Sequence, residues 1–574
     1  MLWLAVLAAG MPSAVSAKAV EVKTATEFVN ALKANYDITL TADIDLSGTS
    51  LSAVDYGGII DGLYMVDGEE KWHALIGAKH TIFGYLNGAT LTHLLLKNCT
   101  LHDTSKLSSG LLAYSARNTK IDYLGVENCS ITDGLILDGS SVVGLLVGWA
   151  ENICSFKHVY VTTSSVNVDG STVGALVGRA QNCTFSDCII DASTQVRGAG
   201  EPIGNVGGIV GWAEYCELTR CVNAGLVGGG DMGDCIGGIC GAQWSSIFTD
   251  CISNGVVVQA DDDTWGTLCD AAVHTSLIDM AVFSFVNAYS FYATMAETAA
   301  DATLGHGLKT AFLEFDAAAQ MTAYQVMGFF IALEVGWLIY DVQDPDEVGG
   351  ICGYAAGGHF ERCINGGTAV SLDAYCGGIV GYATDYDDDK CDIISCLNTG
   401  NIIANEQAGG IVGSFNNGGT LKYCIQTGSL SVDDDDAGPI FGERDGDTKV
   451  GSNITMGRSR GTTGNGIDIM TPEALASGEV ALELNAQIGQ DIWRQNTANE
   501  FTDAEQRAVW GNAALLSLAL QRNGEAVFDG AEAVLSALGV GEINALVERY
   551  AALDGAVNPS AEGGRGEIEA LKKD

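Results

Sequence analysis

The sequence predicts a mainly β protein, a right-handed parallel β-helix (solenoid) with an α-helical hairpin insertion and a helical C-terminal tail. Three observations carry this prediction. A short block of the form glycine, two or three hydrophobic residues, glycine recurs about every thirty residues. The 574 residues include 74 glycines and only 6 prolines, yet 47% of the chain is hydrophobic, which a disordered glycine-rich polymer would not be. Two glycine-poor, apolar stretches interrupt the array once.

The net charge of the chain limits the classes of molecule that we expect it to bind. There are 72 acidic and 28 basic residues, giving a formal net charge of −44. A surface of this sign repels phosphate backbones and anionic lipid headgroups, so we expect no nucleic-acid partner and no peripheral membrane binding.

The N-terminus has the features of an export signal. Residues 2–10 (LWLAVLAAG) form a short apolar run, and small residues precede Lys18 at a plausible cleavage position. The run is too short to span a bilayer as an anchor. We therefore assign residues 1–17 to a signal peptide and expect a secreted or cell-surface protein.

Residues 18–108 are predicted to form an N-terminal helix cap and the first β-helix coils. Residues 24–33 (TATEFVNALK) read as a capped amphipathic helix with Glu27 near its first turn. Residues 38–46 then alternate as a strand. A helix over the first coil would cover an exposed sheet edge, which otherwise invites aggregation.

The repeats occupy residues 109–265 and 346–445. Their first glycines are separated by 34, 30, 34, 30, 112, 28, 32 and 28 residues, counted along the sequence, so one unit takes about thirty residues. The blocks are 110–113 (GLLA), 144–148 (GLLVG), 174–178 (GALVG), 208–211 (GIVG), 238–241 (GICG), 350–353 (GICG), 378–381 (GIVG), 410–413 (GIVG) and 438–442 (GPIFG). With two further apolar pieces per unit, we expect three short strands per coil, stacked to bury a shared core.

A cysteine recurs at one point of each coil. These residues are Cys188, Cys221, Cys251, Cys363, Cys396 and Cys424, and Asn223, Asn365 and Asn398 follow three of them at a spacing of two. Equivalent residues on stacked strands lie about 4.8 Å apart, which exceeds the roughly 3.5–4.5 Å between Cβ atoms in a disulfide. We favour a buried thiol ladder over disulfide bridges, and an amide stack that bonds coil to coil. Cys183, Cys216 and Cys391, five residues before ladder cysteines, are not expected to bind metal with them.

The glycine blocks and the motif Cys-x-Asn-x-Gly resemble the GLUG motif of bacterial surface proteins of the Bacteroidetes type. The segments 42–48 (ADIDLSG) and 84–99 (GYLNGATLTHLLLKNC) resemble the N-terminal coils of those proteins. Residues 470–485 (MTPEALASGEVALELN) with Trp493 resemble the segment that closes their repeat arrays, so we assign 446–500 to that role. The resemblance implies a β-helix exported by a bacterium, and no general activity.

Residues 266–345 break the repeat. The stretches 271–300 and 311–340 are rich in alanine and aromatic residues and are separated by 305–307 (GHG), which predicts two antiparallel helices. A membrane hairpin is the alternative, but Glu314, Asp316 and Glu334 make insertion costly, by roughly 2–4 kcal/mol each on translocon scales. We expect the hairpin to pack on itself or on the β-helix flank.

The tail, residues 501–574, is helical in pattern. Residues 540–547 (VGEINALV) and 564–571 (GRGEIEAL) are similar to each other and spaced like the two half-motifs of a dockerin. The loops before them offer too few oxygen ligands for calcium, so any dockerin is degenerate.

Three acidic runs are candidate calcium sites, because carboxylate clusters suit a hard cation, although their spacing matches no defined calcium loop. Their residues are Asp261, Asp262, Asp263, Asp387, Asp388, Asp389, Asp433, Asp434, Asp435 and Asp436. A solvated turn is the competing interpretation. Apart from possible calcium, no cofactor is expected.

The favoured function is a non-catalytic adhesin-like module that binds a host or dietary glycan, or a surface protein. The alternative is a β-helix polysaccharide lyase or glycoside hydrolase. A lyase needs a basic residue amid positive charge, and a hydrolase needs carboxylates held at a fixed separation. Basic residues in the coils are scattered, and 305–307 lies in the predicted insertion. A third hypothesis makes the insertion the recognition element on a β-helical stalk.

Overall fold

The computed structural model describes residues 18–259, 265, 347–496 and 556–557, apart from short gaps. The gaps are 50–52, 67–68, 103–106, 133–140, 169–171, 192, 199–203, 231–234, 372–374, 388, 405–406, 429, 433–436, 445–447, 457–466, 471–478, 490–491 and 494. The predicted signal peptide and nearly all of the predicted insertion and tail lie outside the described residues. So does the 305–307 motif.

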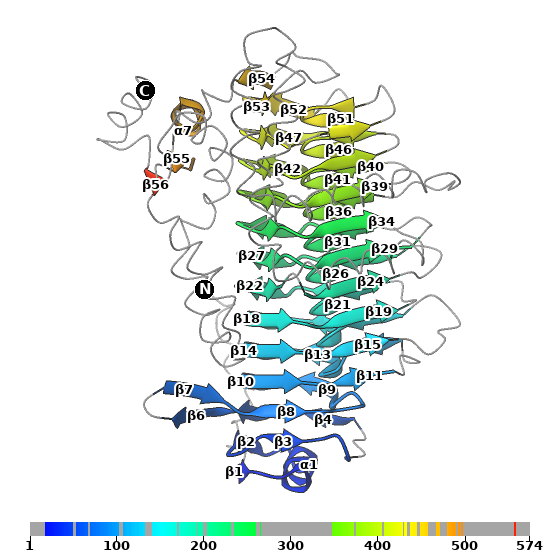
Figure 1. The fold of residues 1–574 in the computed structure, drawn as a ribbon, viewed down its shortest axis with the longest axis vertical. Coiled ribbons are helices and arrows are strands. Elements are labelled where there is room, and N and C mark those ends of the chain that lie inside the picture. Colours follow the sequence, from blue (N-terminus) through cyan, green and yellow to red (C-terminus); the bar gives the residue numbers. More distant parts are fainter. Residues whose placement is uncertain are drawn as a thin grey trace, which may run out of the picture.

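The described chain forms a parallel β-helix, as predicted (Figure 1). Each turn stacks on the previous one through parallel pairing, and four sheets run the length of the stack. We call them sheet 1 (23 strands), sheet 2 (11 strands), sheet 3 (nine strands, from β11, Thr100–Leu101, to β49, Leu430–Val432) and sheet 4 (nine strands, from β12, Ser108–Ser109, to β50, Ala437–Gly438). The stack begins at a helix and rises to β54 (Ile467–Met470).

The first coil is capped by α1 (Ala25–Lys33), which confirms the predicted helix. Thr24 accepts a hydrogen bond from the backbone of Glu27, and the Glu27 carboxylate accepts one from the backbone of Lys23, so two otherwise unpaired donors are satisfied. Phe28 and Leu32 are fully buried against the first strands. The strand expected over 38–46 is split into β2 (Asp37–Leu40) and β3 (Ile44–Asp45).

The coils that contain β14 (Lys120–Glu127) and β18 (Ser155–Thr162) have four strands, and the coils from β20 (Thr172–Gly174) to β49 have five, so the expectation of three was wrong. In one turn these are β25 (Asn205–Gly207, sheet 4), β26 (Val210–Glu214, sheet 2), β27 (Glu217–Thr219) and β28 (Val222–Asn223) of sheet 1, and β29 (Leu226–Gly229, sheet 3). Arg220 separates β27 from β28 with a φ of 52°. This left-handed residue bends the chain without a glycine to mark it.

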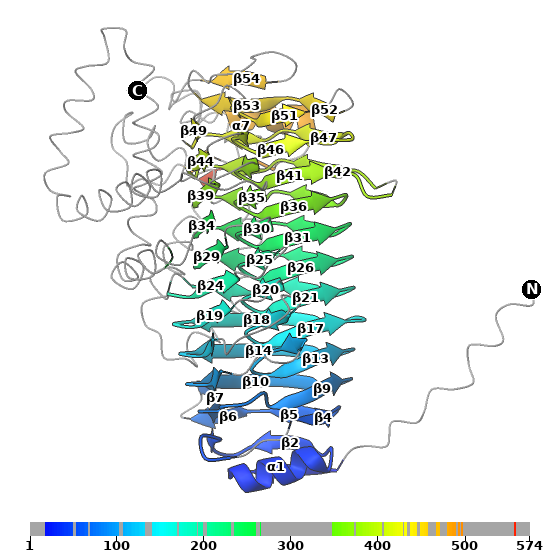
Figure 2. The same cartoon turned by 90° about the vertical axis from the view of Figure 1, so that its right-hand side faces the viewer.

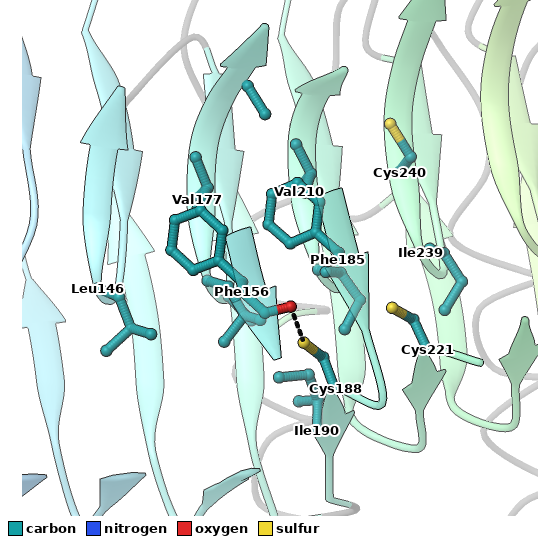
Figure 3. Packing of buried hydrophobic residues seen from close by; sticks show 14 of the residues in the cluster. Leu146, Phe156, Val177, Phe185, Cys188, Ile190, Val210, Cys221, Ile239 and Cys240 are labelled. Carbon is teal, nitrogen blue, oxygen red and sulfur yellow. Dashed lines mark hydrogen bonds between the residues drawn. The ribbon is translucent and has the colours of Figure 1, made fainter. Parts of the chain in front are cut away.

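The interior is packed coil against coil with apolar side chains (Figure 3). Phe156 and Phe185 stack with ring centroids 4.8 Å apart. The six ladder cysteines are buried and free, which confirms the thiol ladder. The Cys188 thiol donates to the carbonyl oxygen of Phe156, one coil below, at 3.6 Å. Cys183, Cys216 and Cys391 are also buried and free.

The amide stack is present at the upper coils. Asn365 Nδ2 donates to Asn398 Oδ1 at 2.8 Å, and Asn398 Nδ2 donates to Gln426 Oε1 at 2.7 Å. Asn223 instead accepts from the backbone of Gly225 within its own turn. Next to this stack the coils approach very closely, since a Cβ at Gly378 would lie 2.1 Å from the carbonyl oxygen of Gly410. That approach explains a glycine at this position of the repeat.

Above the repeats, β52 (Thr448–Gly451), β53 (Asn453–Met456) and β54 continue sheet 1, and α7 (Glu479–Ile488) follows. The Asn485 side chain binds the backbone of Ile492 and Trp493, which fixes the turn after α7. Neither of the two described helices has the length and apolar content that a membrane crossing needs.

Candidate functional site

The outer face of sheet 2 carries a concentration of aromatic side chains. The sheet begins with β4 (Val54–Tyr56) and β9 (Phe83–Asn87), which precede the glycine blocks. Each later strand begins within a block: β13 (Ala113–Arg117), β17 (Val147–Glu151), β21 (Val177–Gln181), β26, β31 (Cys240–Trp244), β36 (Cys352–Ala356), β41 (Val380–Thr384), β46 (Val412–Phe415) and β51 (Phe441–Arg444). Figure 2 shows these strands stacked along one side of the solenoid. The residue directly after the last glycine of a block is partly exposed in five coils, at Trp149, Arg179, Trp212, Tyr354 and Tyr382, and the alanine that follows each of them is buried. Ala242 and Ser414 occupy the same position and are buried.

Pairing brings three of these outward residues into one column. Trp149 is the register partner of Arg179, and Arg179 is the register partner of Trp212. Trp244 sits on the next coil in the adjacent outward column, opposite Glu214. We call Trp149, Arg179, Trp212 and Trp244 the aromatic row. All four side chains are partly exposed.

The guanidinium of Arg179 is held between two indoles. Its central carbon lies 5.0 Å from the ring centroid of Trp149 and 4.3 Å from that of Trp212. Glu214 accepts from Arg179 Nη2 at 3.4 Å and fixes the group from the side. A planar cation over an aromatic face is stabilised by the ring quadrupole, so the three side chains hold one another in place.

Trp244 extends this arrangement to a fourth coil. Its ring centroid lies 4.0 Å from that of Trp212, with the two planes at 64°. Tyr386 approaches Trp244 from the loop between β41 and β42 (Cys391–Ile394), at 6.2 Å between centroids. The row therefore forms a continuous aromatic strip that crosses four coils and ends at a loop.

Three donors in the row have no acceptor among the described residues: Trp149 Nε1, Trp212 Nε1 and Arg179 Nε. A buried donor without a partner costs about 1–3 kcal/mol. All three atoms are closed off from solvent.

A second aromatic cluster lies higher on the same sheet. The Tyr354 and Tyr382 rings stack with centroids 5.6 Å apart, and Tyr375 of sheet 4 lies 5.2 Å from Tyr382. Asn416 donates to the Tyr382 hydroxyl at 3.0 Å. Burial raises the pKa of Tyr354, so its phenol stays neutral.

Glu347 is a buried acid on the neighbouring sheet 4. Burial raises its pKa to about 7, although the Cys235 thiol donates to its Oε2 at 3.3 Å and works against the rise.

Close to the aromatic row, Glu214 forms an ion pair with Arg179, and Glu151 forms one with Arg117. These two carboxylates are thus committed to ion pairs, whereas hydrolysis requires a free acid and base at a set separation.

Only part of the three candidate calcium runs lies among the described residues. Asp387 and Asp389 lie in the loop after β41, where Asp389 accepts from the backbone of Gly358 at 3.1 Å. Asp261–Asp263, Asp388 and Asp433–Asp436 lie outside the described residues. Within the described ranges, no group of three or more His, Cys, Asp or Glu is arranged to hold a metal ion.

Sheet 1 carries a second polar column that the sequence did not reveal. Its members are the left-handed residues at the kink of each coil: His93, Tyr123, His158, Asp187, Arg220, Asp250 and Arg362. The imidazole of His158 stacks on Tyr123 and bonds to Asp122 at 3.0 Å. Although burial works to raise it, the hydrogen bonds and charges of His158 and Lys120 hold the pKa of Asp122 below its ordinary value. Because its charged members pair along the column, we assign it to stability.

Sequence reasoning also missed the aromatic row, because Trp149, Arg179 and Trp212 are about thirty residues apart. A signal was present: each directly follows the second glycine of its block. Aligning the blocks on that glycine places the three in one column.

No known protein family matches the chain, and no curated protein matches it. Among solved structures, a protein from Bacteroides ovatus described as a "putative immunoglobulin A1 protease" is similar with 12% sequence identity and a TM-score of 0.24. The match covers 84% of this chain and 91% of that chain. At this identity and score the likeness carries no inference about activity.

Proposed function

We propose that this protein is a non-catalytic, extracellular β-helix repeat protein that binds neutral glycans through the aromatic row of sheet 2. The observation that carries the proposal is the guanidinium of Arg179 held between the indoles of Trp149 and Trp212. It sets two large, partly exposed aromatic groups on a rigid scaffold, in equivalent positions two coils apart.

The chemistry of the row suits a sugar chain. Sugar rings present apolar C–H faces, which pack on aromatic rings, and hydroxyl groups, which need donors and acceptors nearby. The aromatic row offers partly exposed rings. Its unpartnered N–H groups are buried and do not meet a ligand in this conformation. Two coil steps amount to about 9.6 Å, a span comparable with a disaccharide. The partly exposed edge of Arg179 adds further donors.

The charge of the protein selects the class of glycan. Glu151 and Glu214 flank the row, and the whole chain carries a net charge of −44. Like charges repel over about a Debye length, roughly 8 Å at physiological ionic strength. Neutral glycans of host or dietary origin therefore fit this face better than sulfated or uronate-rich ones.

The cellular setting completes the proposal. The apolar run at 2–10 supports export, and the glycine blocks with Cys-x-Asn-x-Gly support membership of the GLUG-motif surface proteins. These two features and the aromatic row support an adhesin-like role on a bacterial surface. Calcium at the acidic loops is not required by it.

A glycan array tests the proposal. The full chain should bind a set of neutral glycans at physiological salt, and Trp212→Ala should lose that signal. Ile247→Ala, which removes an exposed side chain from the outer face of sheet 1, is the matched control and should bind as the native chain does. Equal binding by Trp212→Ala, or binding confined to acidic glycans, would refute the site. Release of soluble oligosaccharide from a bound glycan would refute the non-catalytic part.

A further inference from the structure

Aromatic residues occupy every second coil at one position of sheet 2. This position is defined by the in-register pairing of the strands from β9 to β36. Its aromatic members, which we call the alternating column, are Tyr85, Trp149, Trp212 and Tyr354. The coils between them carry Ser115, Arg179 and Ala242 at the same position. The aromatic row described above is therefore the middle of a longer, regular series.

The pairing of the backbone fixes the spacing of the alternating column. Strands on neighbouring coils lie about 4.8 Å apart, so successive members are separated by about 9.6 Å and the whole column extends for about 29 Å. Tyr85 is 59% exposed, and the other three members are partly exposed. A ligand that contacts all four members has to be straight over this length and has to repeat at this interval.

A polar column runs beside the alternating column, two residues further along each strand. Its members are in register with one another and are exposed or partly exposed: Asn87, Arg117, Glu151, Gln181 and Glu214. The two carboxylates of this set form ion pairs with Arg117 and Arg179. Amides and paired charges beside aromatic rings suit a chain that has apolar C–H faces and hydroxyl groups along its edge.

We propose that the neutral glycan bound at sheet 2 is an unbranched, extended β-1,4-linked chain that lies along the solenoid axis over the alternating column. This inference rests on the proposed function and adds the class of linkage to it. In such a chain successive sugars are flipped, so every second ring presents the same face, and two sugars cover a length close to two coil steps, about 9.6 Å. Each member of the column then meets an equivalent ring face. An α-1,4-linked chain curves and leaves a straight column.

The outer two members of the column extend the site beyond the two indoles. A trisaccharide covers one two-coil step and reaches Trp149 and Trp212, whereas a hexasaccharide also reaches Tyr85 or Tyr354. The Tyr354 ring is supported by Tyr382, since their centroids lie 5.6 Å apart in a stacked arrangement. Contacts linked through one chain form at a high effective concentration, so each further contact raises the affinity. Affinity should therefore grow with chain length.

Calorimetric titration of the full chain with β-1,4-linked glucose and mannose oligosaccharides tests this. For at least one of the two sugars, the hexasaccharide should bind about tenfold or more tightly than the trisaccharide. The α-1,4-linked glucose hexasaccharide should bind no better than the trisaccharides. Tyr85→Ala/Tyr354→Ala should lower the affinity for the hexasaccharide to that for the trisaccharide, and should change the trisaccharide affinity by less than about twofold.

A matched variant removes two partly exposed tyrosines outside sheet 2. Tyr64 lies on β6 (Leu63–Val66), which is outside the four long sheets, and Tyr423 follows β47 (Gly419–Lys422) of sheet 1. Tyr64→Ala/Tyr423→Ala should bind both lengths as the native chain does. An equal loss of hexasaccharide binding in this control would overturn the inference.

The outcomes separate this inference from the proposed function. Equal affinity for the two chain lengths, equal affinity for the α-1,4-linked hexasaccharide, or unchanged hexasaccharide binding by Tyr85→Ala/Tyr354→Ala would each overturn the extended chain. If the glycan array shows Trp212-dependent binding of other neutral glycans and these oligosaccharides do not bind, the linkage class is wrong and the proposed function stands. If the array shows no such binding, both fail.

Discussion

The central carbon of the Arg179 guanidinium lies 4.3 Å from the ring centroid of Trp212, and Trp149 covers its opposite face. Arg179→Lys keeps the charge but loses the planar group that fits between two indoles. We expect this variant to bind neutral glycan about tenfold more weakly, with a change in unfolding free energy below about 1 kcal/mol because the pair with Glu214 is partly exposed. Titration calorimetry and urea unfolding measure the two effects. Native affinity in Arg179→Lys would show that the sandwich does not shape the site.

The ion pair between Asp250 and Arg362 should contribute strongly to stability. Asp250 is 4% exposed and accepts two hydrogen bonds from Arg362 across adjacent coils. Arg362→Ala removes two hydrogen bonds and the paired charge from a buried carboxylate and should cost about 3 kcal/mol. Arg117→Ala breaks an exposed pair with Glu151 and should cost less than about 1 kcal/mol. Similar shifts of the urea midpoint in the two variants would contradict this account.

The close approach of coils at Gly378 predicts a steric effect. Gly378→Ala would place a Cβ 2.1 Å from the Gly410 carbonyl oxygen and 2.5 Å from Asn398 Cγ. Moving backbone or the amide stack should cost about 2–3 kcal/mol. At Gly451, by contrast, the nearest atom to a new Cβ is 3.8 Å away, so Gly451→Ala should be nearly neutral. The midpoints of thermal unfolding compare the two variants. An unchanged midpoint in Gly378→Ala would contradict the close approach of the coils at this position.

Glu347 should make stability depend on pH. Its pKa rises from an ordinary 4.5 to about 7 on folding, so the folded chain binds the proton more tightly than the unfolded chain. Its contribution is therefore most favourable below pH 4.5 and is lost as the pH rises through 7, by on the order of 3 kcal/mol. Glu347→Gln should be more stable than the native chain at pH 8 and equal at pH 4.5. Urea unfolding at the two pH values measures this, and an equal stability difference between variant and native chain at pH 8 and pH 4.5 would contradict the assignment.

The cysteines should be unreactive until the coils open. Burial raises the pKa of Cys376 to about 12, and the ladder thiols are free and enclosed. Since the thiolate is the reactive form, iodoacetamide at pH 8 should leave the ladder peptides unmodified in the folded protein and label them after denaturation. Mass spectrometry of the digested protein reads this directly. Rapid labelling in the native state, or disulfide-linked peptides, would contradict the thiol ladder.

The architecture could be predicted because the strongest pattern in the sequence, the spacing of the glycine blocks, reflects how the coils stack. Glycines such as Gly378 are required wherever coils nearly touch, and their spacing gives the length of one turn. The number of strands per turn was missed because left-handed residues such as Arg220 bend the chain without being glycine. The aromatic row was missed because it forms only when the register aligns Trp149, Arg179 and Trp212. Nothing within any single repeat indicates that contact.

The most direct test of the account is a calorimetric titration of the native chain and of Trp149→Ala/Trp212→Ala with a neutral oligosaccharide chosen from the array. We predict saturable binding by the native chain and at least a hundredfold weaker binding by the double variant, since stacked aromatic anchors carry about 2 kcal/mol or more each. The variant should unfold at a similar midpoint. Unchanged affinity in the double variant would contradict the assignment of glycan binding to sheet 2.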